Sequence, residues 1–126
     1  MITQNIFDKL LDFSEEVEDA RQSQSPLVAL ESTIISHGLP APDNYDLAKA
    51  AEATIRNNGA IPATIGLING RIKVGLKESE ISYLAESKSA LKISAADIPT
   101  CIAQKKSGGT TVSATLLAAT LTNIKV

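Results

Sequence analysis

Glu31 has the residue type and the setting needed for chemistry on a small ligand. It directly follows the apolar run 27–30 and precedes Ser32. A carboxyl group at the carboxyl end of a buried strand faces the crevice in which α/β proteins bind ligands, and there it can act as a general acid. The alternative is a structural carboxylate that accepts hydrogen bonds from nearby backbone N–H groups or hydroxyls.

The glycine-rich stretch 107–111, Ser-Gly-Gly-Thr-Thr, is a second candidate because it precedes an apolar segment. Glycine lets a backbone approach a ligand closely, and the free N–H groups at a helix start attract anions such as phosphate. A simple turn between two helices, followed by threonine caps, explains the same residues equally well. The lysine of a nucleoside-triphosphate-binding loop is missing, which excludes that class of site.

Lys92 interrupts the short apolar run 91–93, and two explanations fit it. It can place an ammonium group beside the glycine-rich stretch as a phosphate partner, or it can extend into water from an edge strand, the commoner case. His37 has no Cys or carboxylate at metal-ligand spacing, so we interpret it as structural or ligand-binding. Cys101 is interpreted as a core residue.

The composition narrows the function classes further. The chain has 126 residues, of which 44% are hydrophobic and 21% charged, with a net charge of −2. This balance is typical of a soluble globular domain and provides no basic surface for a nucleic acid. The single cysteine suggests a reducing compartment, and neither a signal peptide nor a membrane-spanning stretch is recognisable. We expect a cytoplasmic protein that binds a small molecule.

Hydrophobic periodicity predicts alternating strands and helices, and a core of Ile, Leu, Val and Ala is typical of α/β proteins. Asp43 is expected to cap a helix that buries Leu47, Ala51 and Ile55. In chain order, the predicted elements are one or two amphipathic helices within 5–22, a strand at 27–30 buried on both faces, a helix from 43 to about 57, strands at 61–68 and 71–76, a helix at 78–86, a strand at 91–93, a helix from 94 toward 106, a buried helix at 110–122 and the start of a strand at 124.

Three local signals set boundaries between these elements. Ser14 can cap the second amphipathic helix, and Asn69-Gly70 is the dipeptide best suited to a type I′ hairpin. Ser94 and Asp97 resemble a capping box. A strand of three residues at 124–126 with nothing to pair against is an unusual domain end. We therefore expect either an exposed edge or, preferably, a piece of a longer polypeptide.

Four motifs run in order along the chain and carry a family resemblance. They are residues 28–38 (VALESTIISHG), 59–65 (GAIPATI), 70–76 (GRIKVGL) and 108–115 (GGTTVSAT). Together they resemble the pseudouridine-5′-phosphate glycosidase family, also called the indigoidine synthase A-like family. The resemblance extends from about Pro26 to the last residue and covers less than half of the family's length.

The resemblance implies a three-layer α/β/α fold with a mixed sheet. Residues 1–126 would be the N-terminal part of one such domain, with 1–25 as a helical segment and linker. The implied activity is reversible cleavage of the C–C glycosidic bond of pseudouridine 5′-phosphate to uracil and ribose 5-phosphate through a lysine Schiff base. The implied full-length form is a cytoplasmic homotrimer that uses Mn2+ and binds neither nucleic acid nor membrane.

The resemblance also assigns roles to particular residues. Glu31 matches the proton donor, and Lys92 and Val112 match substrate-binding positions. The family's nucleophilic lysine and metal-binding aspartate match no residue of this chain, so no metal ligand is assigned. Ala95 and Ala96 stand where the family usually has two arginines. The alternative function is a catalytically inactive remnant that binds a sugar phosphate or acts as an oligomerisation module.

Overall fold

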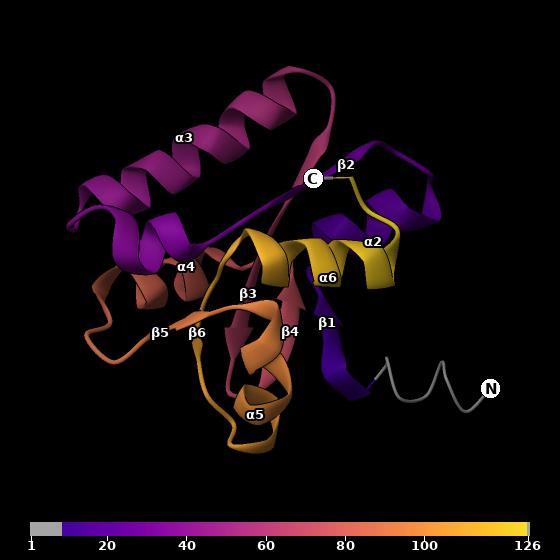
Figure 1. Ribbon diagram of the computed structural model, residues 1–126. Helices are drawn as coiled ribbons and strands as arrows, with labels where there is room; N and C mark the ends of the chain where they lie inside the picture. Colours follow the sequence, from indigo (N-terminus) through magenta and orange to yellow (C-terminus); the bar gives the residue numbers. More distant parts are fainter. Residues whose placement is uncertain (1–8, 126) are drawn as a thin grey trace.

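A hairpin at Asn69-Gly70 forms the centre of the sheet. Both residues have positive φ, 50° and 76°, as a type I′ turn requires. The turn joins β3 (Ile61–Ile68) to β4 (Arg71–Val74) in antiparallel register, as predicted. Figure 1 shows the computed structural model, which describes residues 9–125.

The sheet is mixed and has the strand order β1-β4-β3-β6-β5, with β2 paired to the first half of β3. The pairs β1/β4, β2/β3 and β5/β6 are parallel, and β3 is antiparallel to both β4 and β6. The remaining strands are β1 (Leu11–Phe13), β2 (Leu27–Leu30), β5 (Leu91–Ile93) and β6 (Gly108–Thr110).

Helices cover both faces of the sheet, which gives the three-layer α/β/α architecture that the resemblance implied (Figure 1). Because side chains alternate along β3, Ile65 and Leu67 pack with α5 and α6, and Ile68 packs with α3 and α4. The helical elements are α2 (Glu15–Gln22), the π-helical turn η1 (Ile34–Gly38), α3 (Asp43–Asn57), α4 (Glu78–Glu86), the 3-10 turn η2 (Ala95–Asp97), α5 (Ile98–Ala103) and α6 (Val112–Thr122).

Local capping signals account for two of these helix starts. The Ser14 side chain accepts a hydrogen bond from the backbone N–H of Val17 at 3.2 Å, so α2 begins as predicted. The Asp97 carboxylate accepts a hydrogen bond from the backbone N–H of Ser94 at 3.0 Å, as in the predicted capping box, and a second one from the Ser94 hydroxyl at 2.8 Å. Asp43 is the first residue of α3 and not its cap.

Of the one or two helices predicted within 5–22, α2 is present, but a strand that was not predicted precedes it. Leu11–Phe13 forms a strand that pairs in parallel with β4, because this pairing satisfies the backbone groups of an otherwise open sheet edge. Residues 5–8 of the predicted helical region lie outside the described residues. Along β2 only Ala29 is fully buried, so the prediction of burial on both faces was wrong for this strand.

The predicted buried face of α3 was also wrong. Leu47 is 40% exposed, and the buried residues are Asn44, Ala48 and Glu52. Asn44 donates 2.8 Å hydrogen bonds to the carbonyls of Ile35 and Ala85. Polar groups with specific partners therefore replace the apolar stripe that periodicity alone indicated.

The pair Gly108-Gly109 forms strand β6 between β3 and β5 and does not form the predicted turn. A Cβ atom on Gly108 would lie 2.3 Å from the Leu91 carbonyl oxygen, and one on Gly109 would lie 2.4 Å from the Ser36 hydroxyl. The glycines are therefore required by close packing in the middle of the sheet. At the other end of α6, Lys125 forms a parallel bridge with Val28, so the predicted strand start has a partner.

We expect Gly109→Ala to destabilise the fold by about 3 kcal/mol, because the added methyl would meet the fixed backbone of Ser32 as well as the Ser36 hydroxyl. Gly66→Ala is the matched control, since Gly66 faces Gly109 across the sheet. Its Cβ would meet only the ends of two leucine side chains, at 3.2 Å or more, and we expect a cost of about 1 kcal/mol. Urea unfolding of both variants checks the difference, and equal costs would contradict this account of β6.

Candidate functional site

The carboxyl ends of β2 and β6 meet beside the middle of β3. β2 runs parallel to the first half of β3, whereas β6 runs antiparallel to its second half, so the two strands point toward each other. Where they meet, the backbone N–H of Ser32 donates to the carbonyl of Thr110 at 3.0 Å. The segments that follow both strands therefore emerge at one place, which is the usual position of ligand sites in α/β folds.

A buried network of hydroxyl groups holds this junction together. The Ser32 hydroxyl donates to the Ile65 carbonyl and accepts from the backbone N–H of Thr110 at 2.8 Å. The Thr110 hydroxyl donates to the same carbonyl at 2.8 Å and lies 2.9 Å from the Thr115 hydroxyl on α6. Ser32, Thr110 and Thr115 are all fully buried, so these hydroxyls bond to protein groups and not to water. Together their bonds join β2, β3, β6 and α6 rigidly.

Glu31 lies at the edge of this junction, between β2 and η1. Its Oε1 atom accepts a hydrogen bond from the backbone N–H of Ile34 at 3.2 Å, so it stabilises the start of the π-helical turn. The structural role considered from the sequence is thus present. Glu31 also lines an apolar hollow of about 220 Å³ together with Thr64 and residues of α3. A carboxyl group that faces both a backbone turn and a hollow can hold and deliver a proton.

Lys92 lies on the other side of β6, in register with Gly109. Its strand, β5, is the last in the sheet order, and the Lys92 side chain is exposed. Lys92 is thus on an edge strand, as the explanation by exposure to water requires, and beside the glycine-rich stretch, as the phosphate-binding explanation requires. Lys92 lines a separate hollow of about 330 Å³ with Asp97, Thr100 and other residues of α5.

Val112 is the first residue of α6 and is 59% exposed. The first intrahelical bond of α6 runs from the Thr115 N–H to the Thr111 carbonyl, so the N–H groups of the first turn lack acceptors within the helix. Next to it, the hydroxyl of Ser113 accepts from the backbone N–H of Ala95 at 3.0 Å. Ala95, one of the two positions at which the resemblance implied arginine, therefore lies beside the start of α6.

The structure brings the three predicted site residues to neighbouring segments but not into one cavity. Glu31 is followed by Ser32, whose backbone N–H bonds to Thr110 at the end of β6. Lys92 is paired with Gly109, and Val112 lies two residues after Thr110, at the start of α6. Glu31 and Lys92 nevertheless line different hollows. The buried hydroxyls of Ser32, Thr110 and Thr115 were not predicted. The available signal is Thr115, whose neighbours in the sequence, Ala114 and Leu116, are both apolar.

The remaining two candidates are His37 and Cys101. The Ser36 hydroxyl lies 2.7 Å from Nδ1 of His37, on the exposed side of η1. Cys101 is buried in the core between α5 and the sheet, as predicted, and burial raises the pKa of its thiol. Among residues 9–125, no group of three or more His, Cys, Asp or Glu side chains is arranged to hold a metal ion.

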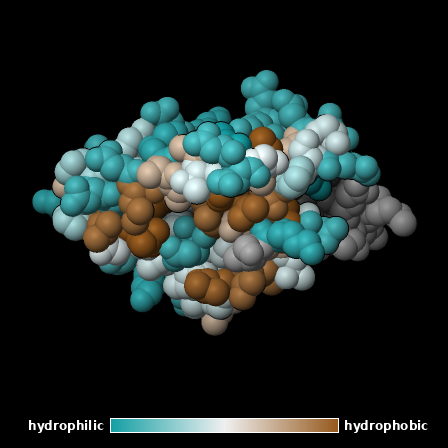
Figure 2. Space-filling model, turned by 90° about the horizontal axis from the view of Figure 1, so that it is seen from above, coloured by the Kyte–Doolittle hydropathy of each residue, from teal (hydrophilic) through white to brown (hydrophobic). Residues whose placement is uncertain are grey.

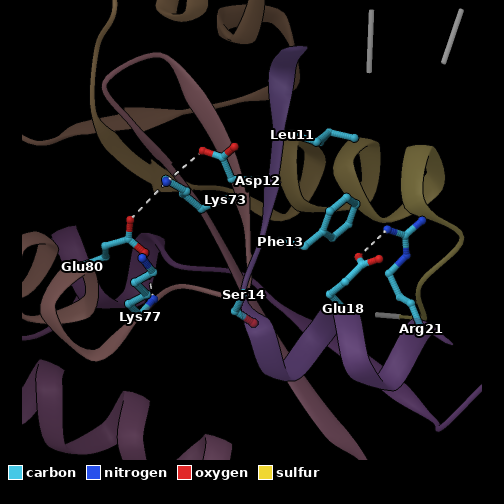
Figure 3. A pocket seen from close by; sticks show the side chains of 10 residues that line it. Leu11, Asp12, Phe13, Ser14, Glu18, Arg21, Lys73, Lys77 and Glu80 are labelled. Carbon is cyan, nitrogen blue, oxygen red and sulfur yellow. Dashed lines mark hydrogen bonds and ion pairs between the residues drawn. The ribbon is translucent and has the colours of Figure 1, made fainter. Parts of the chain in front are cut away.

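A larger hollow, about 620 Å³, lies away from this junction, between β1, β4, α2 and α4. Figure 3 shows that Lys73 bridges two carboxylates across it, with Nζ at 2.9 Å from Asp12 and 3.5 Å from Glu80. Arg21 stacks on Phe13, with 4.0 Å from its guanidinium carbon to the ring centroid. These charges are already neutralised by one another, so the hollow is better explained as a structural ion-pair cluster.

Asp12 is the best-defined titrating group of this cluster. The pKa of its carboxyl group is lowered to about 2, mainly by the hydrogen bond from Arg71; burial opposes this effect and Lys73 adds to it. The bonds from Arg71 to the two carboxylate oxygens measure 2.7 and 2.8 Å. The cluster therefore attaches the short strand β1 to β4 by charge as well as by backbone pairing.

The fold is that of an α/β protein with a candidate ligand site where two strand ends meet, and sequence comparison specifies the class. A family model described as "Indigoidine synthase A like protein" matches residues 16–126. The chain belongs to this family. No helix among the described residues is long and apolar enough to cross a bilayer.

Curated relatives carry one shared name. The pseudouridine-5′-phosphate glycosidase of Caldanaerobacter subterraneus subsp. tengcongensis is 50% identical over 118 residues, which cover 94% of this chain and 38% of that protein. The protein of the same name from Brachyspira hyodysenteriae is 49% identical, and the match covers 97% of this chain and 40% of that protein. The chain thus spans about two fifths of the length of the relatives it matches.

Two solved structures have the same arrangement of elements. The prealnumycin C-glycosynthase AlnA in complex with ribulose 5-phosphate is 38% identical, with a TM-score of 0.81, over 93% of this chain and 37% of that one. An indigoidine synthase A-like protein from Thermotoga maritima is 30% identical, with a TM-score of 0.81, over 93% of this chain and 38% of that one. In each case this fold is part of a chain more than twice as long.

We expect Ser32→Ala to cost about 1–3 kcal/mol in the free energy of unfolding, because the buried N–H of Thr110 loses its acceptor. Ser23→Ala is the control, since Ser23 is exposed and its hydroxyl bonds locally. Its cost should stay within about 0.5 kcal/mol. Urea denaturation measures both values. A Ser32→Ala variant as stable as the wild type would show that the hydroxyl network does not hold the junction.

The Asp12 cluster predicts a defined pH dependence of stability. Because the folded-state pKa of Asp12 is lowered from 3.8 to about 2, its contribution is complete above about pH 4 and disappears as the pH falls through about 2. The wild type should therefore exceed Asp12→Asn in stability near neutral pH, and the difference should shrink between these limits. Salt at about 1 M should reduce it, since the group is partly exposed. A difference that is independent of pH would refute the ion-pair assignment.

Proposed function

We propose that this chain forms the proton-donor and substrate-binding part of a pseudouridine-5′-phosphate glycosidase. The reaction is reversible cleavage of pseudouridine 5′-phosphate to uracil and ribose 5-phosphate. The observation that carries the proposal is the position of Glu31 directly before Ser32, whose bonds with Thr110 join the end of β2 to the strand that leads into α6. The names of the curated relatives support the same reaction.

The chemistry requires a proton donor because cleavage replaces the sugar carbon on uracil with hydrogen. Glu31 is the donor in this proposal, and its hydrogen bond with the N–H of Ile34 fixes the carboxyl group in place. The electron pair of the broken C–C bond stays with the uracil carbon that takes the proton, so the sugar carbon is left electron-deficient. A lysine amine bonded to that carbon stabilises it as a Schiff base, which water hydrolyses to release ribose 5-phosphate. This lysine belongs to a part of the family fold that this chain does not match.

Two further residues bind the substrate in this proposal. Lys92 supplies a positive charge beside Gly109, where it attracts the phosphate group. Val112 contributes through the backbone N–H groups of the first turn of α6, which have no acceptor within the helix. Binding energy from a remote phosphate can then be used at the reacting carbon. Ala95 and Ala96 leave this region with less positive charge than the family pattern implies.

Manganese has no assigned step in this proposal. The described residues contain no cluster of three or more side chains that could hold it, and the residues present therefore do not fit a resident metal. The family resemblance places the metal-binding aspartate in a part of the fold that this chain does not match. The homotrimer that the resemblance implies is likewise a proposal for the full-length form, and light scattering tests it.

Binding of a sugar phosphate without catalysis is the second candidate. The observation that favours it is the ribulose 5-phosphate complex of AlnA, a structural neighbour with a TM-score of 0.81. In this case the chain binds ribose 5-phosphate but does not release uracil. Calorimetric titration with ribose 5-phosphate, followed by the cleavage assay, separates the two functions.

The cleavage assay compares this chain with a chimera in which it replaces the matched part of the Caldanaerobacter relative. We expect uracil release with Mn2+ from the chimera only, because the chain alone lacks the nucleophile. Glu31→Gln in the chimera should lower kcat by about 100-fold or more. Lys92→Met should raise KM for the phosphorylated substrate.

Matched controls keep these outcomes specific. Glu86→Gln and Lys88→Met remove the same charges at exposed positions outside the junction and should leave both constants unchanged. Turnover by the 126-residue chain alone would overturn the assignment of the nucleophile to another part of the fold. An unchanged kcat in Glu31→Gln would remove the proposed role of Glu31.

A further inference from the structure

Helix α6 presents its small residues to the core and its large ones to the outside. Its buried residues are Ala114, Thr115, Ala118, Ala119 and Thr122. The large apolar residues face outward, with exposed fractions of 59% for Val112, 46% for Leu116, 37% for Leu117 and 38% for Leu121. A helix with one solvated face normally has the opposite distribution. We call these four residues the outer face of α6.

Packing within this chain accounts for the small residues on the inward face of α6 but not for the large apolar residues on its outward face. Alanine and threonine at the core side let α6 approach β3 and β6 closely, and Thr115 joins the hydroxyl network. Nothing in residues 9–125 covers the four large side chains. Scattered single hydrophobic residues are normal on a protein surface, whereas several on one helix indicate an interaction surface. The space-filling view in Figure 2 also shows hydrophobic side chains gathered in patches between hydrophilic ones.

The two solved structures contain a further part of the chain that could cover the outer face of α6. Both solved structures retain the arrangement seen here with a TM-score of 0.81, yet this arrangement is only 37% and 38% of their length. More than half of each chain therefore lies outside this arrangement and is available to pack against it. The parallel bridge between Lys125 and Val28 indicates where a further strand can extend the sheet. It would pair with β2, on the side where α6 ends.

We propose that the outer face of α6 is the docking surface for the part of the family fold that follows the matched region in the relatives. The proposal rests on family membership and packing, and it does not depend on the proposed reaction. It adds one feature to that reaction, because Val112 belongs both to the outer face and to the proposed substrate site. The docked segment then completes the proposed site at Val112.

The chimera described above tests this proposal through stability. The double variant Leu117→Asn with Leu121→Asn keeps the side-chain size but removes its apolar character. In the chimera we expect the melting temperature to fall by about 5 °C or more, and in the 126-residue chain by at most about 2 °C. Leu47→Asn is the matched control, since Leu47 is an equally exposed leucine on a helix of the opposite layer. A change in the chimera no larger than in the short chain overturns the proposal.

Thiol labelling provides a second measurement that does not depend on destabilisation. A single Leu117→Cys variant should react with a maleimide at least about tenfold more slowly in the chimera than in the short chain, while buried Cys101 reacts slowly in both. Equal rates would refute docking. If the short chain is a dimer that the double variant converts to a monomer, and the chimera is unaffected, the face belongs to a second copy and the proposal is wrong. A protected but inactive chimera would reject only the proposed function.

Discussion

The close approach of β2 and β6 is the constraint on which the rest of the structure depends. The strands that point toward each other leave no room for a side chain at Gly109, whose Cβ would meet the backbone of Ser32, and β5 leaves none at Gly108, whose Cβ would meet the Leu91 carbonyl. The polar groups left there are buried, and an unpaired buried N–H or carbonyl would be costly. Ser32 and Thr110 satisfy these groups, and in doing so they fix Glu31 on one side and α6 on the other.

Sequence reasoning succeeded where a local chemical rule determines the structure. The Asn69-Gly70 hairpin, the Ser14 cap and the Ser94–Asp97 box each depend on a few adjacent residues, and all three are present. Four family motifs together identified the fold, although no one of them would have done so. The three proposed site residues were found as candidates, but their roles remain proposals because the structure fixes position and not activity.

Sequence reasoning failed where distant segments decide the outcome. Gly108-Gly109 has the composition of a turn, and only the pairing with β3 and β5 makes it a strand. The buried face of α3 carries Asn44 and Glu52, whose polar groups find partners on η1, α4 and β3 that periodicity cannot show. In both cases a tertiary contact outweighs an intrinsic preference, and neither contact is visible from neighbouring residues.

The division of the site between two hollows has a physical cause in the same junction. The hollow at Glu31 adjoins α3 and the hollow at Lys92 adjoins α5, helices that pack on opposite faces of the sheet, and β6 lies between the two residues. β6 ends where Thr111 and Val112 begin α6. In the two proposals above, Val112 belongs both to the substrate site and to the docking surface, so the segment that docks on α6 also bounds the proposed substrate site.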